Sequence, residues 1–226
     1  MNDVSLLPLL LNMDKRRVVV FGGGEVGHRK ASLFSNYCHV DVVSRSFVPE
    51  LKELEGAGET VHLVVVDELD EHTIETYAKG ASVVVAATDD DVLNMRIAAL
   101  AHVHGALVNS VHDVVDVVVP SIIELEGAVV AISTRGASPA MSKFLRLKLE
   151  EAIESAVPSQ LPLMVRLQQE LRELLKAEVL DQHERARLLW GVLENDGVWE
   201  GLASSYEQGF KRALAYVELQ VKEGDG

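Results

Sequence analysis

The sequence predicts an α/β fold, in which a parallel sheet is covered by helices on both faces and is followed by a β-hairpin and a C-terminal helical domain. Three observations lead to this prediction. Short apolar runs alternate with helical patterns through the first half of the chain, which is typical of a parallel sheet. Two apolar strand patterns then follow one another around the Glu126-Gly127 turn without a helix between them. Beyond residue 139, apolar residues recur at helical spacing.

Composition narrows the kind of protein. The chain has 226 residues, of which 48% are hydrophobic, and a formal net charge of −14. This charge repels nucleic acids and anionic membranes, so neither is an expected partner. The single cysteine, Cys38, excludes an internal disulfide and a multi-cysteine metal site, and indicates a reducing compartment. We therefore expect a cytoplasmic protein. The histidines show no metal-binding spacing, so we expect no tightly bound metal.

The first strand and the turn after it carry the strongest binding signal. The apolar run 18–21 leads into Gly22-Gly-Gly-Glu-Val-Gly27, which has the G-x-G-x-x-G spacing. These glycines allow a sharp turn, close approach of the backbone to a pyrophosphate, and tight packing of helix on strand. Free N–H groups at the helix start then bind the phosphate. The pattern indicates a Rossmann-type dinucleotide site; the alternative is a turn that only lets a helix pack on a sheet.

The end of the second strand leaves the choice of dinucleotide open. Residues 40–43 form this strand, and Ser44-Arg45 follows it. Dinucleotide folds that prefer NAD usually place an acid here to hold the adenine ribose. Arg45 can face either the 2′-phosphate of NADP or solvent.

The remaining elements of the sheet follow in regular alternation. Thr88 and Asp89 come directly after a fully apolar strand, and open α/β sheets bind ligands at this carboxyl edge. The run of acids 89–91 also caps the next helix, because carboxylates are favoured at helix N-termini. The predicted helices span about residues 48–54 and 73–79 and a stretch through Asn94 and Leu100; the strands span 61–66, 82–87 and 106–109.

The pattern changes at residue 116. Residues 117–124 and 128–133 form the predicted hairpin, in which Pro120 requires an edge or a bulge. Its apolar strands need a cover, so we predict a dimer there.

The C-terminal part of the chain is predicted to be helical, with helices over about 140–156, 162–178, 182–194 and 205–222. The predicted domains are residues 1–113 for dinucleotide binding, 114–145 for dimerisation and 146–226 as a helical domain.

Several of these motifs together resemble one family. They are Leu7-Pro8-Leu9 with Leu11, the glycine turn with Arg29-Lys30-Ala31, Ala86-Ala-Thr-Asp-Asp90 with Asn94, Val108-Asn109, Pro120-Ser121 and Ser133-Thr-Arg-Gly-Ala-Ser-Pro139. Over residues 5–150 they closely resemble the precorrin-2 dehydrogenases, a family of sirohaem synthesis that includes the N-terminal half of bacterial sirohaem synthase.

The resemblance implies an NAD-dependent oxidation of precorrin-2 to sirohydrochlorin by a homodimer. In some members ferrous iron insertion follows, so iron as a second substrate stays open. The family's acidic catalytic residue lies three positions after the asparagine that corresponds to Asn109, where this sequence has His112. Either the neighbouring Asp113 takes this role through a slipped loop, or His112 replaces it as the base.

The resemblance also suggests which residues bind each ligand. A tetrapyrrole carries many carboxylates, so an acidic protein must offer cations locally, as arginine forks or lysine point charges. The expected substrate residues are Arg29, Lys30, Ser133, Arg135, Gly136, Ser138 and Lys143. The expected NAD residues are Gly22, Gly24, Glu25, Val26, Gly27, Ser44, Arg45, Thr88, Asp89 and Asn109. The alternative is a Rossmann-type sensor or scaffold that binds a dinucleotide or tetrapyrrole but has lost its chemistry at position 112.

Overall fold

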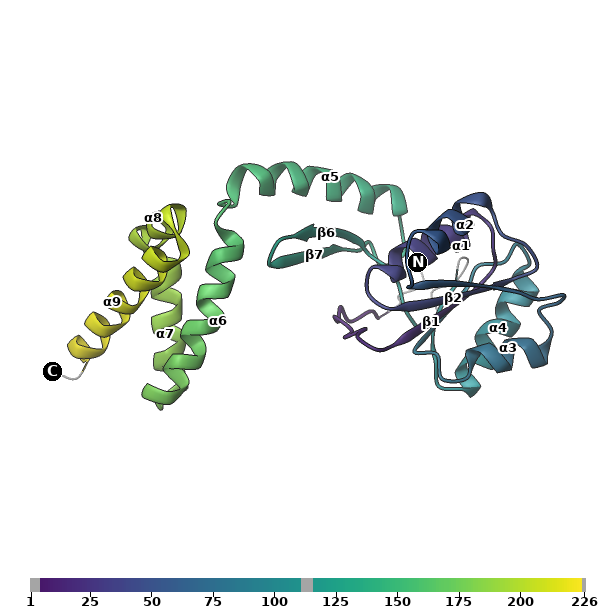
Figure 1. Ribbon diagram of the computed structural model, residues 1–226, viewed down its shortest axis with the longest axis horizontal. Helices are drawn as coiled ribbons and strands as arrows, with labels where there is room; N and C mark the ends of the chain where they lie inside the picture. Colours follow the sequence, from purple (N-terminus) through teal and green to yellow (C-terminus); the bar gives the residue numbers. More distant parts are fainter. Residues whose placement is uncertain (1–4, 111–115, 225–226) are drawn as a thin grey trace. The chain divides into compact units, whose positions relative to one another are not determined.

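The computed structural model describes residues 5–110 and 116–224 and divides into two compact units (Figure 1). Unit 1 comprises Met1–Val119 and Ser133–Ser138, and unit 2 comprises Pro120–Ile132 and Pro139–Gly226. The chain therefore passes from one unit to the other three times, and the hairpin groups with the helical part. The three-part division predicted from the sequence stays a prediction.

Unit 1 contains a five-stranded parallel sheet, which confirms the predicted α/β fold. The strand order is β3-β2-β1-β4-β5, so the glycine turn after β1 lies at the centre of the carboxyl edge, between the ends of β2 and β4. The pairings run in register from Val18 opposite Val40 and Val83 to Phe21 opposite Val43 and Ala86. The strands are β1 (Arg17–Phe21), β2 (His39–Ser44), β3 (Val61–Val65), β4 (Val83–Ala86) and β5 (Leu107–Ser110).

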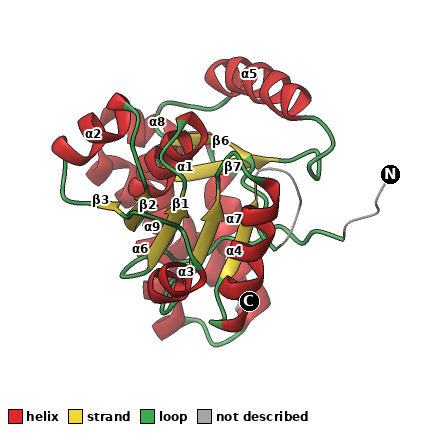
Figure 2. Cartoon of the chain, turned by 90° about the vertical axis from the view of Figure 1, so that its right-hand side faces the viewer, coloured by secondary structure: helices red, strands yellow, loops and turns green. Residues whose placement is uncertain are grey.

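Helices cover both faces of this sheet, because alternate side chains of each strand point to opposite faces. Val18 and Val20 pack in one apolar core and Val19 and Phe21 in another, and all four are fully buried. The first core includes side chains of α1 (Glu25–Ser35) and α2 (Pro49–Gly56). The second includes side chains of α3 (Glu71–Ala78) and α4 (Asp91–Val103), and Figures 1 and 2 show these two pairs of helices on opposite sides.

Unit 2 has its own core, built from helices. Leu167, Leu171, Leu188 and Val192 are buried there with residues of the last two helices. The elements are β6 (Ser121–Leu125), β7 (Ala128–Ile132), α5 (Pro139–Ala156), α6 (Leu161–Glu178), α7 (Gln182–Leu193), α8 (Asp196–Ser204) and α9 (Tyr206–Gly224). In the described part of the chain, no helix is both long and apolar enough to cross a membrane.

Two details of unit 2 differ from the sequence prediction. The hairpin is antiparallel as expected, but its first strand begins at Ser121 and not at residue 117. Pro120 has no N–H to donate, so pairing starts after it. A separate helix, α8, lies between the helices predicted over 182–194 and 205–222, and it begins after Asn195, whose side chain accepts the N–H of Val198 as the N-cap.

Candidate dinucleotide-binding site

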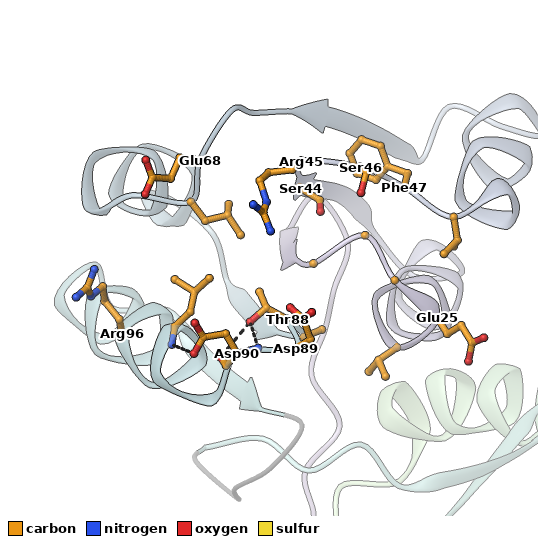
Figure 3. Close-up of a pocket in the computed structure, with 18 of the residues that line it drawn as sticks. Glu25, Ser44, Arg45, Ser46, Phe47, Glu68, Thr88, Asp89, Asp90 and Arg96 are labelled. Atoms are coloured by element: carbon orange, nitrogen blue, oxygen red, sulfur yellow. Dashed lines mark hydrogen bonds between the residues drawn. The ribbon is translucent and has the colours of Figure 1, made fainter.

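A cavity of about 880 Å³ opens at the carboxyl edge of the sheet in unit 1 (Figure 3). Its walls come from the ends of β1, β2 and β4, from the first turns of α1 and α4, and from the loop before α3. This is where open α/β sheets bind ligands, beside the point at which the chain switches from one side of β1 to the other. The lining residues are Gly22 to Val26, Ser44 to Val48, Glu68 to Asp70, Ala87 to Asp90, Val92, Leu93 and Arg96.

The three glycines of the motif have three different roles in the structure. Gly22 has a φ of +124°, and a Cβ placed there would lie 2.3 Å from the carbonyl oxygen of Ala87. A Cβ on Gly27 would lie 2.0 Å from the carbonyl oxygen of Gly22, so this glycine allows α1 to pack on β1. A Cβ on Gly24 would meet no atom of the protein within 4 Å, although Gly24 lines the cavity. The space beside Gly24 in the cavity is therefore open.

The helix that follows offers free donors to the same space. Gly24 is the N-cap of α1, and it has no side chain to accept a hydrogen bond from the first turn. By contrast, Asp90 caps α4 with one carboxylate oxygen, which accepts the N–H groups of Val92 and Leu93. A bound phosphate would satisfy the donors of α1 and would favour the positive end of the helix dipole. The residues present thus fit a dinucleotide pyrophosphate.

Thr88, which follows β4, forms another wall of the cavity. Its N–H and its hydroxyl both donate to Oδ1 of Asn94, at 3.0 and 2.8 Å, and its carbonyl accepts from Nδ2 of Asn94 at 3.0 Å. Asn94 is buried and holds this turn in place. Asp89, next to Thr88, is exposed, lines the cavity and makes no hydrogen bond within the described residues. It is free to contact a ligand.

The structure brings eight of the ten predicted NAD residues to the cavity. Gly27 is not among the lining residues because it is buried under the glycine turn. Asn109 is also buried; its Nδ2 donates to the carbonyl oxygen of Val117 at 2.6 Å, while its Oδ1 has no partner among the described residues. The roles of all ten toward a cofactor stay predictions.

Sequence reasoning missed a second set of lining residues. Ser46 to Val48 follow β2, Glu68 to Asp70 follow β3, and Leu93 and Arg96 lie on α4. The prediction stopped at the first residues after each strand. The strand order was the missing information, because only the position of β3 beside β2 brings the 68–70 loop to this cavity.

The predicted catalytic pair, His112 and Asp113, lies outside the described residues. The chain on both sides of the pair is well anchored. The N–H groups of Asp116 and Val117 both donate to the carbonyl oxygen of Val108 at 3.1 Å. The Asp116 carboxylate accepts the N–H of Val108 at 2.8 Å and lies 2.7 Å from Nε2 of His102.

The predicted substrate residues fall into three groups. Arg29 and Lys30 lie on α1, and the pKa of the Lys30 ammonium lies below its usual value because of burial and, secondarily, the neighbouring Arg29 charge. The turn that contains Ser133, Arg135, Gly136 and Ser138 is held by the Thr134 hydroxyl, which donates to the Ser138 carbonyl and accepts the Ser138 N–H, both at 3.0 Å. Lys143 lies on α5, in unit 2.

Comparison with known proteins identifies related sequences and a related fold. The pattern of a putative NAD(P)-binding family matches residues 9–121. The precorrin-2 dehydrogenase of Methanosarcina barkeri is 41% identical over 215 residues, which make up 94% of each chain. The siroheme synthase of Escherichia coli is 30% identical over 202 residues, which are 88% of this chain and 42% of that longer protein. A solved structure, SirC, precorrin-2 dehydrogenase, aligns with a TM-score of 0.62 at 21% identity, covering 94% of this chain and 99% of its own.

The fold and the cavity define a Rossmann-type protein with a site for a nicotinamide dinucleotide. The likeness to SirC shows that the whole fold, hairpin and helices included, recurs in a solved structure. The identity to the Methanosarcina barkeri protein over nearly the full length shows that the chain belongs to the precorrin-2 dehydrogenase family, which confirms the resemblance seen in the motifs.

Proposed function

We propose that this protein oxidises precorrin-2 to sirohydrochlorin, a step of sirohaem biosynthesis, with NAD as the hydride acceptor. One observation carries the proposal most directly. A chain of the precorrin-2 dehydrogenase family keeps an open space at Gly24, beside uncapped donors of α1, at the carboxyl edge of its sheet. These features support binding of a dinucleotide pyrophosphate.

The reaction removes a hydride and a proton from the substrate, since loss of the hydride alone would leave an uncompensated cation. A bound nicotinamide supplies the acceptor for the hydride. The protein must supply the base for the proton, and Asp113 is our first choice, because a carboxylate also stabilises a cationic intermediate. His112 is the second choice, because the usual pKa of an imidazole lies close to neutral pH.

The cations of unit 1 are our proposed contacts for the carboxylates of the substrate. Lys30 lies on α1 in a partly buried position beside Arg29, and its lowered pKa reflects the cost of holding a charge there. A bound carboxylate would reduce this cost and favour the charged amine. Arg135 is exposed in a turn with a φ of +55°, where its side chain is available for a bidentate contact.

We also propose that the protein acts as a homodimer through α5 and the hairpin. On α5, Ser142 is the buried residue, while Met141, Phe144, Leu145, Leu147 and Leu149 are between 38% and 54% exposed. Val129 of the hairpin is 54% exposed. Apolar side chains gathered in this way are typical of an interface between subunits.

Ferrous iron insertion and a cytoplasmic location stay predictions. In the described part of the chain, no group of three histidine, cysteine or acidic side chains can hold a metal ion. Iron as a substrate needs only transient contact, so this finding does not decide the second activity.

Turnover distinguishes the proposed enzyme from a sensor or scaffold of the same fold. The purified protein, incubated with precorrin-2 and NAD, should produce the absorbance of sirohydrochlorin. Binding of NAD and of the tetrapyrrole without any product would favour the sensor and overturn the proposed activity.

A further inference from the structure

The end of β2 has an unusual composition for a site that takes only NAD. Ser44, Arg45 and Ser46 line the cavity where dinucleotide folds that prefer NAD place an acid against the ribose 2′-hydroxyl. We propose that these three residues form a subsite for the 2′-phosphate of NADP, so that the cavity accepts NADP in addition to NAD. The inference rests on the dinucleotide binding proposed above and adds a specificity to it.

Backbone contacts place residues 44–46 beside the glycine turn. The N–H of Gly22 donates to the carbonyl of Val43 at 3.0 Å, and the N–H of Val48 donates to the carbonyl of Gly23 at 2.9 Å. A Cβ on Gly23 would lie 2.0 Å from the carbonyl oxygen of Ser46. The 44–46 segment is therefore packed against the turn that would hold the pyrophosphate, so this segment would be the neighbour of a ribose attached there.

The side chains of the segment are available to bind an anion. Arg45 is exposed, and Figure 3 shows its guanidinium directed into the cavity. Within the described residues, Arg45 has no ion pair, and the hydroxyls of Ser44 and Ser46 have no hydrogen bond. A guanidinium and serine hydroxyls are the donor set that a phosphate monoester needs, with two parallel N–H groups for its oxygens.

Acidic side chains that oppose a phosphate also line this cavity: Glu25 on α1, Glu68 and Asp70 before α3, and Asp89 and Asp90 after β4. Asp90 is engaged as the N-cap of α4. The Asp70 carboxylate likewise accepts the N–H of Thr73 at 2.8 Å as the N-cap of α3. Among the described residues, Glu68 caps no helix and makes no ion pair with Arg45, and Figure 3 shows both residues along the upper edge of the cavity. An acid at position 45 would repel the phosphate and bind the 2′-hydroxyl, whereas Arg45 attracts the phosphate.

Two isomeric probes, 2′,5′-ADP and 3′,5′-ADP, test the proposal by calorimetry with the full-length protein. They carry equal charge and differ only in the ribose carbon that bears the second phosphate. We expect the wild type to bind 2′,5′-ADP roughly 10-fold more tightly, which is the scale of one charge-assisted bidentate contact. Arg45→Ala should abolish this preference, and Glu68→Gln should increase it. Arg16→Ala is the matched control, because Arg16 is exposed and does not line the cavity.

Equal affinity for the two isomers in the wild type would overturn the proposal, as would a preference that survives Arg45→Ala. A preference that falls as much in Arg16→Ala would show only the effect of net charge and would also overturn it. Circular dichroism of each variant checks that it is folded. Oxidation of precorrin-2 with NAD but without isomer preference contradicts this inference alone. An isomer preference without oxidation of precorrin-2 supports the subsite and contradicts the proposed activity.

Discussion

Asn94 holds Thr88 by three hydrogen bonds, two to its Oδ1 and one from its Nδ2. The carboxamide matches the turn because it supplies an acceptor for the Thr88 N–H and hydroxyl and a donor for the Thr88 carbonyl. Since Asn94 is on α4 and Thr88 follows β4 by two residues, these bonds also hold the first turn of the helix against the end of the sheet. One buried side chain thus supports this wall of the cavity, together with hydrogen bonds between Thr88 and Asp90.

Replacing Asn94 by Asp tests this dependence. The variant keeps an acceptor but loses the donor and buries a charge, so we expect the turn to open more easily, at a cost of about 1–3 kcal/mol. Hydrogen–deuterium exchange of the peptide that contains residues 83–94 should speed up accordingly, and NAD should bind more weakly. Met95→Ala on the same helix is the control, because Met95 is 60% exposed. An unchanged exchange rate in Asn94→Asp would mean that the turn at Thr88 does not need the Asn94 carboxamide.

The glycine motif gives a prediction with opposite outcomes at two positions. Gly24→Val should fold normally, since a Cβ there meets no protein atom within 4 Å, and should lose measurable NAD binding because the side chain fills the space for the phosphate. Gly22→Ala should instead destabilise the fold, because φ is +124° and the new Cβ would clash with Ala87. Thermal denaturation and calorimetry separate the two effects. Normal NAD affinity in a folded Gly24→Val would contradict the assignment of the site.

The catalytic pair can be separated by substitution. We expect Asp113→Ala to lower turnover by about 10²–10⁴-fold with NAD binding intact, the usual contribution of a positioned base. If His112 is the base, His112→Ala shows this loss, and the wild-type rate falls as the pH drops through the imidazole pKa, because a protonated imidazole cannot accept a proton.

Full activity in both variants would redirect the search to Asp89. Asp90 already caps α4, and Asp116 already binds the Val108 N–H, whereas Asp89 is free in the cavity. Asp89→Asn would then be the next variant to measure.

The proposed dimer predicts that a charge placed on α5 abolishes dimerisation but leaves unit 2 folded. Phe144→Glu places a carboxylate on an exposed position, so unit 2 should still fold, but the apolar interface should be lost. Analytical ultracentrifugation should show a dimer for the wild type and a monomer for this variant. Gln208→Glu, on an exposed position of α9, adds the same charge as a control. A wild-type monomer at micromolar concentration would contradict the dimer.

The parts of the fold that could be predicted depend on local signals. Gly22 and Gly27 identify the turn because each has a backbone or space requirement within the protein that only glycine meets, and Gly24 completes the spacing of the motif. The β4 run is recognisable because a strand buried on both faces is apolar throughout. By contrast, α8 is absent from the predicted helices, because an asparagine such as Asn195 is equally typical of a turn and of an N-cap.

The parts that could not be predicted depend on contacts between distant segments. Glu68 reaches the cavity only because β3 pairs with β2, and no local pattern around Glu68 indicates this. Arg96 lies mid-helix and resembles a surface charge in the sequence, yet it lines the cavity from α4. Asp116 lies beside His102, which is fourteen residues earlier on α4. The sequence alone does not indicate this pairing.

The balance of products tests the central claim most directly. NADH and sirohydrochlorin can be followed at separate wavelengths in one reaction that contains the wild-type protein, precorrin-2 and NAD. The proposed mechanism predicts that both form at the same rate and in equal amounts, because one hydride leaves each precorrin-2, and that neither forms with Gly24→Val. Sirohydrochlorin without NADH, or neither product from a wild-type protein that binds NAD, would contradict an NAD-dependent precorrin-2 dehydrogenase.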